Sequence, residues 1–298
     1  MSLNFDRISN VIYMGSAGAL SVLPYQALCD AGRRPCAVAV ETGKNPAAPH
    51  RALPVIAESR DVLESLALAD GIPVIKLSQD TQNAVHQLST YAPDIVIVSC
   101  FGRKLAEPLL SVPTIGCFNL HPSVLPAYRG PSPVFWQFRA GVKTMGVTLH
   151  RMTAQLDAGD IVAQAMVDIA DGITLQQAGR LLAEAGSRLL VEALVRQGRS
   201  GWSGRAQQEG KAAYYGFPVN SDYAVSARWT AQRLYNFMRA TRGQGIVYPC
   251  SVEGRLFNLV EAIGFRKTGA ARLIVQDDEV TLPCCSGSVR ARFLPDPL

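Results

Sequence analysis

The sequence predicts an α/β protein with a mostly parallel, Rossmann-like sheet that carries helices on both faces, followed by a small β-rich, barrel-like C-terminal domain. Short apolar runs alternate with helix-length segments through the first two thirds of the chain. This alternation is typical of a parallel sheet that is covered on both sides. The last third instead holds one helical segment followed by several short β-like runs, a pattern typical of a small barrel-like module.

Short apolar runs of the first two thirds predict the strands of the large sheet. These runs are Val11–Gly15, Cys36–Glu41, Pro73–Lys76, Asp94–Cys100, Gly116–Leu120, Gly146–Arg151 and Ile161–Val167. The segments between them carry apolar residues at helical spacing, which indicates amphipathic helices. We therefore expect helices over Leu20–Ala31, Asp61–Asp70, Thr81–Tyr91 and Leu105–Leu110.

Thr174 marks the start of a long helix that closes the first domain, because threonine is a good N-cap and leucines recur at helical spacing after it. The Gly- and Ser-rich stretch Gln197–Arg205 then indicates a boundary. We expect a first domain over residues 1–200, a linker over 201–217 and a small β-rich domain over 218–298. That second domain holds a predicted helix, Thr230–Ala240, and the β-like runs Leu273–Gln276 and Glu279–Leu282.

Composition argues against disorder, a membrane anchor and a metal site. Hydrophobic residues make up 48% of the chain and charged residues 18%, as in folded globular proteins. No apolar stretch reaches the roughly 18 residues of a spanning helix, and the first residues do not resemble a signal peptide. The seven cysteines are an odd number, which fits free thiols in a reducing cytoplasm. The pair Cys284–Cys285 lacks the spacing of a zinc site, so we expect no metal.

The net charge of +5 is concentrated in the last third of the chain. Residues 1–200 hold 17 Lys and Arg against 16 Asp and Glu, whereas residues 201–298 hold 12 against 8. A basic carboxy-terminal third fits a polyanionic partner such as RNA, although an ordinary solvated surface explains the same imbalance.

The most informative segment is Cys117–Pro131, where a predicted strand ends and a proline-rich loop begins. Side chains alternate along a strand, so Asn119 and His121 fall on one face. They do so at the carboxyl end of a strand in a parallel sheet, which is the edge where such sheets place ligand sites. An amide that donates to a developing oxyanion and an imidazole that moves a proton together suit acyl transfer.

A carboxylate that orients the imidazole would complete such a site. Asp157 lies in a Gly-containing turn between two predicted strands, and Asp160 is the competing choice. Plain structural roles are the alternative for all of these residues. His121 would then be a satisfied polar group, Asn119 the cap of a turn, and Asp157 the stabiliser of the Ala-Gly turn beside it.

The run Asn-Leu-His-Pro-Ser-Val-Leu-Pro-Ala-Tyr-Arg-Gly at 119–130, followed by Asp-Ala-Gly at 157–159, resembles the signature of folate-dependent formyltransferases. That family includes methionyl-tRNA formyltransferase, glycinamide ribonucleotide formyltransferase and the amino-sugar formyltransferases. Weaker similarity extends over residues 10–195. The helix-then-β tail is similar to the carboxy-terminal domain that the methionyl-tRNA and some sugar enzymes share.

The resemblance implies a formyl donor, 10-formyltetrahydrofolate, and a role for each member of the trio. Asn119 would polarise the formyl oxygen, His121 would manage the proton of the amine, and Asp157 would support the imidazolium. It further implies a folate pocket. The residues expected to form this pocket are Phe101, Gly102, Arg103, Lys104, Leu105, Ser123, Leu125 and Pro126. Simple core packing is the alternative for Phe101 and Leu105.

Three hypotheses about the function follow, and the first two differ in the acceptor. The first is a methionyl-tRNA-formyltransferase-like enzyme, whose basic C-terminal domain would bind charged initiator tRNA. The second is a formyltransferase for a small amine such as a nucleotide-linked amino sugar, which the short, weakly basic loop Thr42–Pro54 and the segment Gly146–Met152 favour. The third is a catalytically inactive folate- or RNA-binding homologue that kept the fold.

Overall fold

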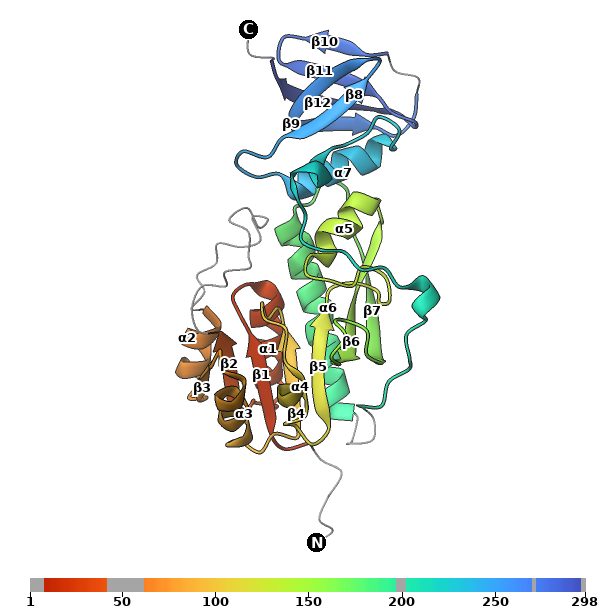
Figure 1. Cartoon of the computed structure of the whole chain (residues 1–298). Helices are drawn as coiled ribbons and strands as arrows, with labels where there is room; N and C mark the ends of the chain where they lie inside the picture. Colours follow the sequence, from red (N-terminus) through yellow and green to blue (C-terminus); the bar gives the residue numbers. More distant parts are fainter. Residues whose placement is uncertain (1–7, 42–61, 197–201, 270–271, 296–298) are drawn as a thin grey trace.

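The structure is a computed structural model that describes residues 8–41, 62–196, 202–269 and 272–295. A large sheet with helices and a smaller sheet follow one another along the long axis of the molecule (Figure 1). The loop Thr42–Pro54, Asp61 of the second predicted helix and positions 197–201 of the predicted domain boundary lie outside the described residues.

The large sheet has seven strands in the order β3-β2-β1-β4-β5-β6-β7. The first five in this order pair in parallel, and β6 and β7 are antiparallel to their neighbours. This arrangement confirms the predicted mostly parallel, Rossmann-like sheet. The strands are β1 (Val11–Gly15), β2 (Ala37–Glu41), β3 (Val74–Leu77), β4 (Ile95–Ser99), β5 (Gly116–His121), β6 (Thr144–Arg151) and β7 (Ile161–Asp168).

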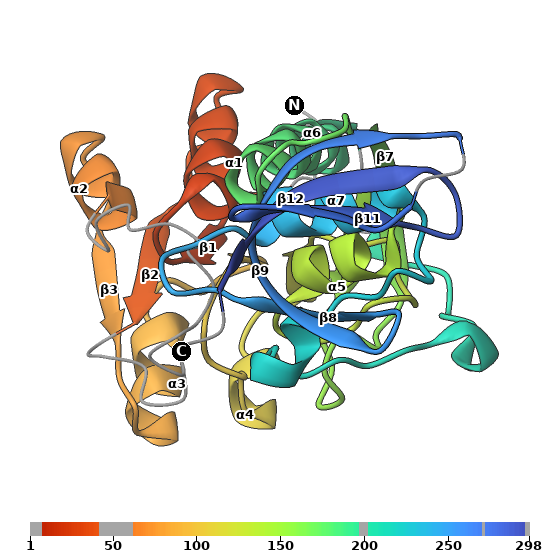
Figure 2. The ribbon, with the colours of Figure 1, turned by 90° about the horizontal axis from the view of Figure 1, so that it is seen from above.

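Helices cover both faces of this sheet because its central strands are apolar on both sides. Alternate residues of β1 enter different cores, since Tyr13 packs with residues of α1, α2 and α6 whereas Ile12 and Met14 pack with residues of α3 and α4. Figure 2 shows the two groups of helices on opposite faces. The helices are α1 (Ala19–Asp30), α2 (Val62–Ala69), α3 (Thr81–Ser89), α4 (Glu107–Leu110) and α6 (Leu175–Arg196).

One helix, α5 (Pro133–Ala140), was not expected from the sequence. The prolines around it indicate a loop, but proline is tolerated in the first helical turn, where its missing N–H has no intrahelical partner anyway. The helix ends at Gly141, which takes the left-handed conformation with φ 76°. This helix faces the C-terminal domain (Figure 1).

The C-terminal region contains α7 (Ala231–Thr241) and a five-stranded antiparallel sheet in the order β10-β11-β12-β9-β8. The long β9 (Arg255–Arg266) pairs with both β8 (Tyr248–Val252) and β12 (Ser288–Leu294). Two register shifts interrupt the pairing of β9 with β12, as strongly curved sheets require. The remaining strands are β10 (Ile274–Gln276) and β11 (Glu279–Pro283). This sheet confirms the predicted β-rich module.

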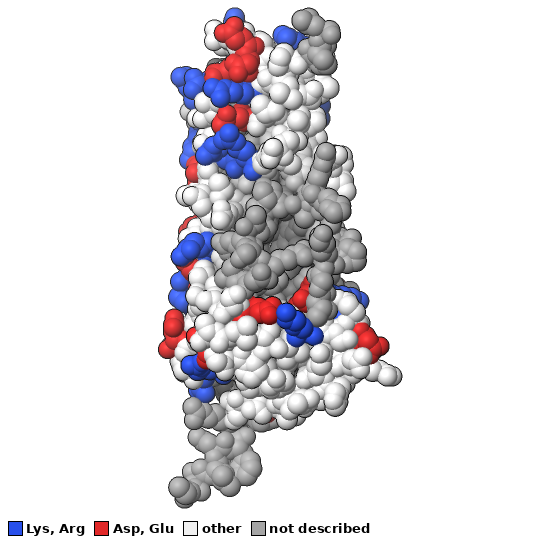
Figure 3. Space-filling model, turned by 90° about the vertical axis from the view of Figure 1, so that its left-hand side faces the viewer, with Lys and Arg blue, Asp and Glu red and all other residues white. Residues whose placement is uncertain are grey.

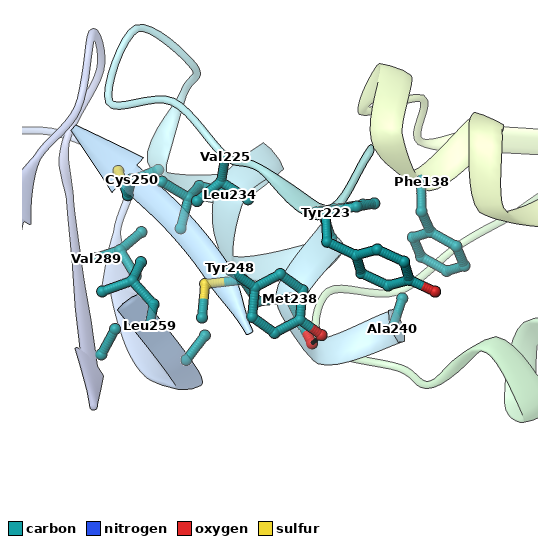
Figure 4. Packing of buried hydrophobic residues seen from close by; sticks show 14 of the residues in the cluster. Phe138, Tyr223, Val225, Leu234, Met238, Ala240, Tyr248, Cys250, Leu259 and Val289 are labelled. Atoms are coloured by element: carbon teal, nitrogen blue, oxygen red, sulfur yellow. Dashed lines mark hydrogen bonds between the residues drawn. The ribbon is translucent and has the colours of Figure 1, made fainter. Parts of the chain in front are cut away.

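A single apolar core joins the two regions. Phe135 and Phe138 of α5 pack in one cluster with Tyr223, Phe237 and Tyr248 of the C-terminal region. Figure 4 shows Phe138 reaching from α5 toward Tyr223 and Ala240. Burial of several aromatic side chains in this cluster stabilises the contact between α5 and the C-terminal region through the hydrophobic effect.

Residues 202–217 of the stretch predicted as a linker lie along the large sheet and its loops. Trp202 is fully buried and packs edge-on against Phe118 of β5, with ring centroids 4.7 Å apart. Isolated bridges then pair Arg205 with Ile161 and Tyr214 with Arg129. The segment that follows Trp202 is therefore extended and hydrogen bonded to the large sheet and its loops.

Three findings concern the predictions about cysteines, membrane spans and metal sites. All seven cysteines are free thiols. No helix in the described parts of the chain combines the length and the apolar character that crossing a bilayer requires. Over those same residues, no group of three His, Cys, Asp or Glu side chains gathers closely enough to hold a metal ion.

Candidate active site

Strand β5 presents Asn119 and His121 at the carboxyl edge of the large sheet. Its neighbour β6 runs antiparallel and places His150 directly opposite Asn119 in the register. Nδ2 of Asn119 lies 3.3 Å from Nε2 of His150. The His121 and His150 rings are both buried, and their centroids lie 6.2 Å apart in an edge-to-face arrangement. Two adjacent strands thus bring an amide and two imidazoles together.

Asp157 lies between the two imidazoles. Its Oδ2 is 3.7 Å from Nδ1 of His121, and its Oδ1 is 3.6 Å from Nε2 of His150. The backbone N–H of Gly130 donates a hydrogen bond of 2.8 Å to Oδ2. Of the two carboxylates that the sequence offered, the structure brings Asp157 to the imidazoles, whereas Asp160 contributes its backbone carbonyl to Arg151.

Backbone carbonyls fix the neutral tautomer of each ring, since a carbonyl oxygen can only accept a hydrogen bond. Nε2 of His121 lies 3.0 Å from the Tyr128 carbonyl and therefore carries the proton. Nδ1 of His150 lies 2.9 Å from the Arg151 carbonyl and carries the proton of that ring. The Asn119 amide therefore donates to the unprotonated Nε2 of His150, and Nδ1 of His121 keeps a lone pair beside Asp157.

Burial and charge set the protonation states at neutral pH. Burial alone raises the pKa of Asp157, but attraction to the two imidazoles in their protonated forms and the hydrogen bond from the Gly130 N–H outweigh it and hold the pKa at about 2. Burial lowers the pKa of His121 below 6.5, and the Asp157 carboxylate offsets only part of this effect. The site therefore holds an ionised carboxylate next to a neutral imidazole.

A cavity of about 480 Å³ opens next to this cluster and is lined by Asn119, His121, His150 and Asp157. The predicted folate residues Phe101, Gly102, Arg103, Lys104 and Leu105 also line it. They follow β4, the strand beside β5, so adjacent strand ends converge on one space. Leu105 also packs in the core, as its alternative interpretation expected. Arg103 is held by hydrogen bonds to the Ser78 carbonyl, at 2.7 Å, and to Gln79.

Three residues of the predicted folate set, Ser123, Leu125 and Pro126, do not line the cavity. The hydroxyl of Ser123 is buried and donates to the Ala127 carbonyl at 2.8 Å. The backbone N–H of Leu125 donates to the Thr148 hydroxyl, and its side chain is buried. The loop after His121 folds back onto β6, so these side chains shape the loop instead of facing the cavity.

Sequence reasoning missed His150 and the part of the cavity wall formed by residues 214–218. Tyr214 and Phe217 of the predicted linker line the cavity, as does Pro218, the first residue of the predicted C-terminal domain. The exposed fraction is 61% for Tyr214 and 43% for Phe217, so both side chains are accessible to a ligand. Alternation along Gly146–Arg151 could have placed His150 on one strand face, but the register against Asn119 depends on antiparallel pairing that one sequence does not reveal.

The fold and the cluster define an α/β protein of the Rossmann-like class, with an amide, an imidazole and a carboxylate at the carboxyl edge of its sheet. A family model described as formyl transferase matches residues 47–194, a range that holds Asn119, His121 and Asp157. The methionyl-tRNA formyltransferase of Thermotoga maritima is 32% identical over 184 residues, which is 61% of this chain and 59% of that protein. The methionyl-tRNA formyltransferase of Thermotoga neapolitana is 35% identical over 171 residues, covering 57% and 55%.

Residues 47–194 of the chain match the formyl transferase family, and the chain is similar to curated members of that family. The stretch matched to these curated relatives spans less than two thirds of their length. Solved structures share the fold over a longer range. The N-formyltransferase from Helicobacter canadensis, in complex with folinic acid and dTDP-3-aminofucose, has a TM-score of 0.67 at 16% identity and covers 96% of this chain and 99% of its own. Glycinamide ribonucleotide transformylase 1 from Symbiobacterium toebii has a TM-score of 0.53 at 23% identity, covering 65% and 89%.

Proposed function

We propose that this protein transfers a formyl group from 10-formyltetrahydrofolate to a primary amine, in the manner of a methionyl-tRNA formyltransferase. One observation carries the proposal: Asn119, His121 and Asp157 converge at the wall of a 480 Å³ cavity, with His121 Nδ1 and Asp157 Oδ2 3.7 Å apart. Cavities of roughly 300–1,000 Å³ with few convergent polar groups are typical of small-molecule sites.

The reaction needs a stabilised oxyanion and a proton acceptor. The amine nitrogen attacks the formyl carbon, a C–N bond forms, and the carbonyl oxygen becomes negative. Asn119 has a second amide N–H that is not directed at His150, and this N–H donates to the oxyanion. The proton of the attacking nitrogen goes to Nδ1 of His121. The imidazolium that forms is stabilised by the ionised Asp157 beside it.

Collapse of the tetrahedral intermediate completes the transfer. His121 returns the proton to the folate nitrogen as the bond between this nitrogen and the formyl carbon breaks. The products are the N-formyl amine and tetrahydrofolate. The low pKa of His121 keeps the ring neutral, and so able to accept a proton, at the start of each cycle.

The folate donor fits the side of the cavity that is built from strand-end loops. Residues 101–105 after β4 offer backbone groups together with the apolar side chains of Phe101 and Leu105. Met152 and Leu156, which follow β6, add apolar surface to the same cavity. A largely apolar wall suits a flat heteroaromatic ring such as a pterin.

A nucleotide-linked amino sugar is the second candidate acceptor. The Helicobacter canadensis enzyme, whose complex contains dTDP-3-aminofucose, matches nearly the full length of this chain, whereas the methionyl-tRNA enzymes match little more than half of it. Ion pairs in the C-terminal sheet also favour a small acceptor. Arg242 and Arg292 both bind Glu261, so part of the positive charge expected to attract RNA is neutralised.

A transfer assay with two acceptor classes tests the proposal. Purified protein, 10-formyltetrahydrofolate and either charged initiator tRNA or a panel of nucleotide-linked amino sugars are combined, and N-formyl products are detected by mass spectrometry. We expect product with one class and its loss in His121→Ala. If folate binds but no amine is formylated by the wild-type protein, the catalytically inactive homologue is the correct alternative.

A further inference from the structure

Residues 202–219, called the strap from here on, are hydrogen bonded to the two loops that contact the His121–Asp157 pair. Arg205 and Ile161 exchange two backbone hydrogen bonds of 2.9 Å. Farther along, the Arg129 N–H donates to the Ala213 carbonyl, and the Tyr215 N–H donates to the Arg129 carbonyl. The strap thus follows the catalytic domain as an added strand-like segment.

One strap side chain, Gln207, bridges the two loops. Its Nε2 donates to the carbonyls of Asp157, at 2.8 Å, and Gly159, at 2.7 Å. Its Oε1 accepts from Nε and Nη2 of Arg129, at 3.2 and 2.8 Å. Both N–H groups and the oxygen of the Gln207 amide are therefore used, which fixes the orientation of this side chain.

Arg129 links this bridge to both catalytic groups. The residue before it, Tyr128, places its carbonyl on His121, and the residue after it, Gly130, donates its N–H to Asp157. The buried guanidinium also forms two hydrogen bonds with the carboxylate of Glu209 on the strap, at 2.7 and 3.1 Å. Paired contacts of this kind are strong and directional.

The strap also passes too close to the loop for any side chain at position 130. Gly130 has φ 114°, and a Cβ at this position would lie 1.9 Å from the Tyr215 carbonyl oxygen. Only glycine fits there while the strap is in place. Close approach and hydrogen bonding therefore both tie the strap to the loop that contacts Asp157 and His121.

We propose that Gln207 is a positioning residue that holds Asp157 against His121, so that the strap completes the active centre. Gln207 lines no part of the cavity and acts through the backbone carbonyls of Asp157 and Gly159 and through Arg129. The catalytic interpretation of this geometry rests on the proposed function. A small displacement of the carboxylate matters because misplacement of about 1 Å can cost on the order of 10²-fold in rate.

Substitution of Gln207 separates this role from general support of the fold. Gln207→Ala removes the bridge, whereas Gln207→Glu still accepts from Arg129 but cannot donate to the Asp157 and Gly159 carbonyls. Gln208→Ala is the matched control, because Gln208 is the next residue and its side chain is exposed. Equal folding of the four proteins is checked by circular dichroism and urea unfolding.

The first readout is the titration of the His121 ring by NMR, assigned with His121→Gln. The titratable groups that face this ring are Asp157 and His150. We expect the His121 pKa to fall in Gln207→Ala and Gln207→Glu, because a displaced Asp157 no longer favours the imidazolium, and to stay unchanged in Gln208→Ala. Identical titrations in wild type and both Gln207 variants would overturn the proposal.

The second readout is formyl transfer, which distinguishes failure of this inference from failure of the proposed function. We expect kcat to fall by about 10–100-fold in both Gln207 variants, with the KM for the folate donor within about 2-fold of wild type. A wild-type protein without transfer activity would reject the proposed function and leave the titration test valid. Equal kcat in wild type and the Gln207 variants would reject the role of Gln207 alone.

Discussion

At the scale of single residues, the site depends on which ring nitrogens carry protons. His150 donates from Nδ1 to the Arg151 carbonyl, so its Nε2 accepts from the Asn119 amide. This contact orients the amide and leaves its second N–H for a ligand oxygen. A donor fixed before substrate arrives stabilises an oxyanion without the cost of reorganising during the reaction.

Loss of the Asn119 amide is the first residue-scale prediction. We expect Asn119→Ala to lower kcat by about 10²–10³-fold, which is typical of removing one oxyanion donor. The urea unfolding midpoint should change little, because Asn119 is only partly buried. Asn83→Ala, an exposed asparagine on α3, serves as the control. A kcat of Asn119→Ala within about threefold of the wild-type value would show that Asn119 has no part in the mechanism.

The pH dependence of activity is the second residue-scale prediction. Burial lowers the His121 pKa below 6.5, so the acid limb of kcat/KM is expected below pH 6.5. Asp157 has a pKa of about 2 and stays ionised throughout the measurable range, so it adds no limb there. An acid limb above pH 6.5 would contradict the assignment of His121 as the proton acceptor.

Stability should follow the same two groups. The unfolded chain protonates His121 more readily than the folded protein, so the free energy of unfolding decreases as pH falls from 6.5 toward the lowered folded pKa. Asp157 contributes stability above its ordinary pKa of 3.8, and this contribution is lost as pH falls toward about 2. Urea unfolding of wild type and His121→Gln between about pH 5 and 7, the range in which histidines titrate, measures the first effect. The variant should not show this decrease.

At the scale of elements, the strap packs against the large sheet through one buried aromatic side chain. Trp202 is fully buried against Phe118, next to the strand residue Asn119. We expect Trp202→Ala to destabilise the protein by about 3–5 kcal/mol, as large-to-small changes of buried aromatic residues do. Trp202→Phe should lose less because it keeps an aromatic ring against Phe118. Equal urea midpoints for Trp202→Ala and wild type would show that the strap adds no stability.

The strap also supplies the exposed aromatic part of the cavity wall. Tyr214 and Phe217 line the cavity with 61% and 43% of their surfaces exposed. If the acceptor docks on this wall, Tyr214→Ala should raise the acceptor KM by about 10-fold, since stacking on an aromatic ring contributes roughly 1–3 kcal/mol. The KM of the folate donor should not change. Val219→Ala, which alters an exposed strap residue outside the cavity, is the control.

Sequence alone accounted for the large sheet and for two strand-face residues, and physical reasons explain the rest. Alternation placed Asn119 and His121 on one face of β5, and the structure agrees. It could not place His150, because that requires the antiparallel register of β6. Helix α5 was missed because Pro131 and Pro133 indicate a loop. Residues 201–217 are predicted only as a linker, and side-chain bridges such as that of Gln207 could not be predicted because they leave no periodic pattern.

At the scale of the whole molecule, the charge pattern of the C-terminal region bears on the choice between the two proposed acceptors. Figure 3 shows basic and acidic side chains interleaved at the end of the molecule that holds the C-terminal sheet. Arg242 and Arg292 lie 2.8 and 3.4 Å from the two oxygens of Glu261, and Arg290 lies 3.7 Å from Glu279. Exposed pairs add little stability, but each carboxylate lowers the positive potential that would attract phosphates.

Substitution of Glu261 tests whether this sheet meets RNA. Each phosphate contact steepens the decrease of log K with log salt by about 0.7–0.9. If RNA binds on this surface, Glu261→Gln frees Arg242 and removes one of the ion pairs of Arg292, which still pairs with Asp278 and Glu279. The affinity for tRNA at low salt should then rise and the salt slope should steepen by about 1. Glu253→Gln, in the turn between β8 and β9, changes the net charge equally without altering these two ion pairs. Matching slopes for wild type and both variants would place RNA away from this sheet. Without an RNA contact on this sheet, the charge pattern would favour a small nucleotide-linked amine as the acceptor.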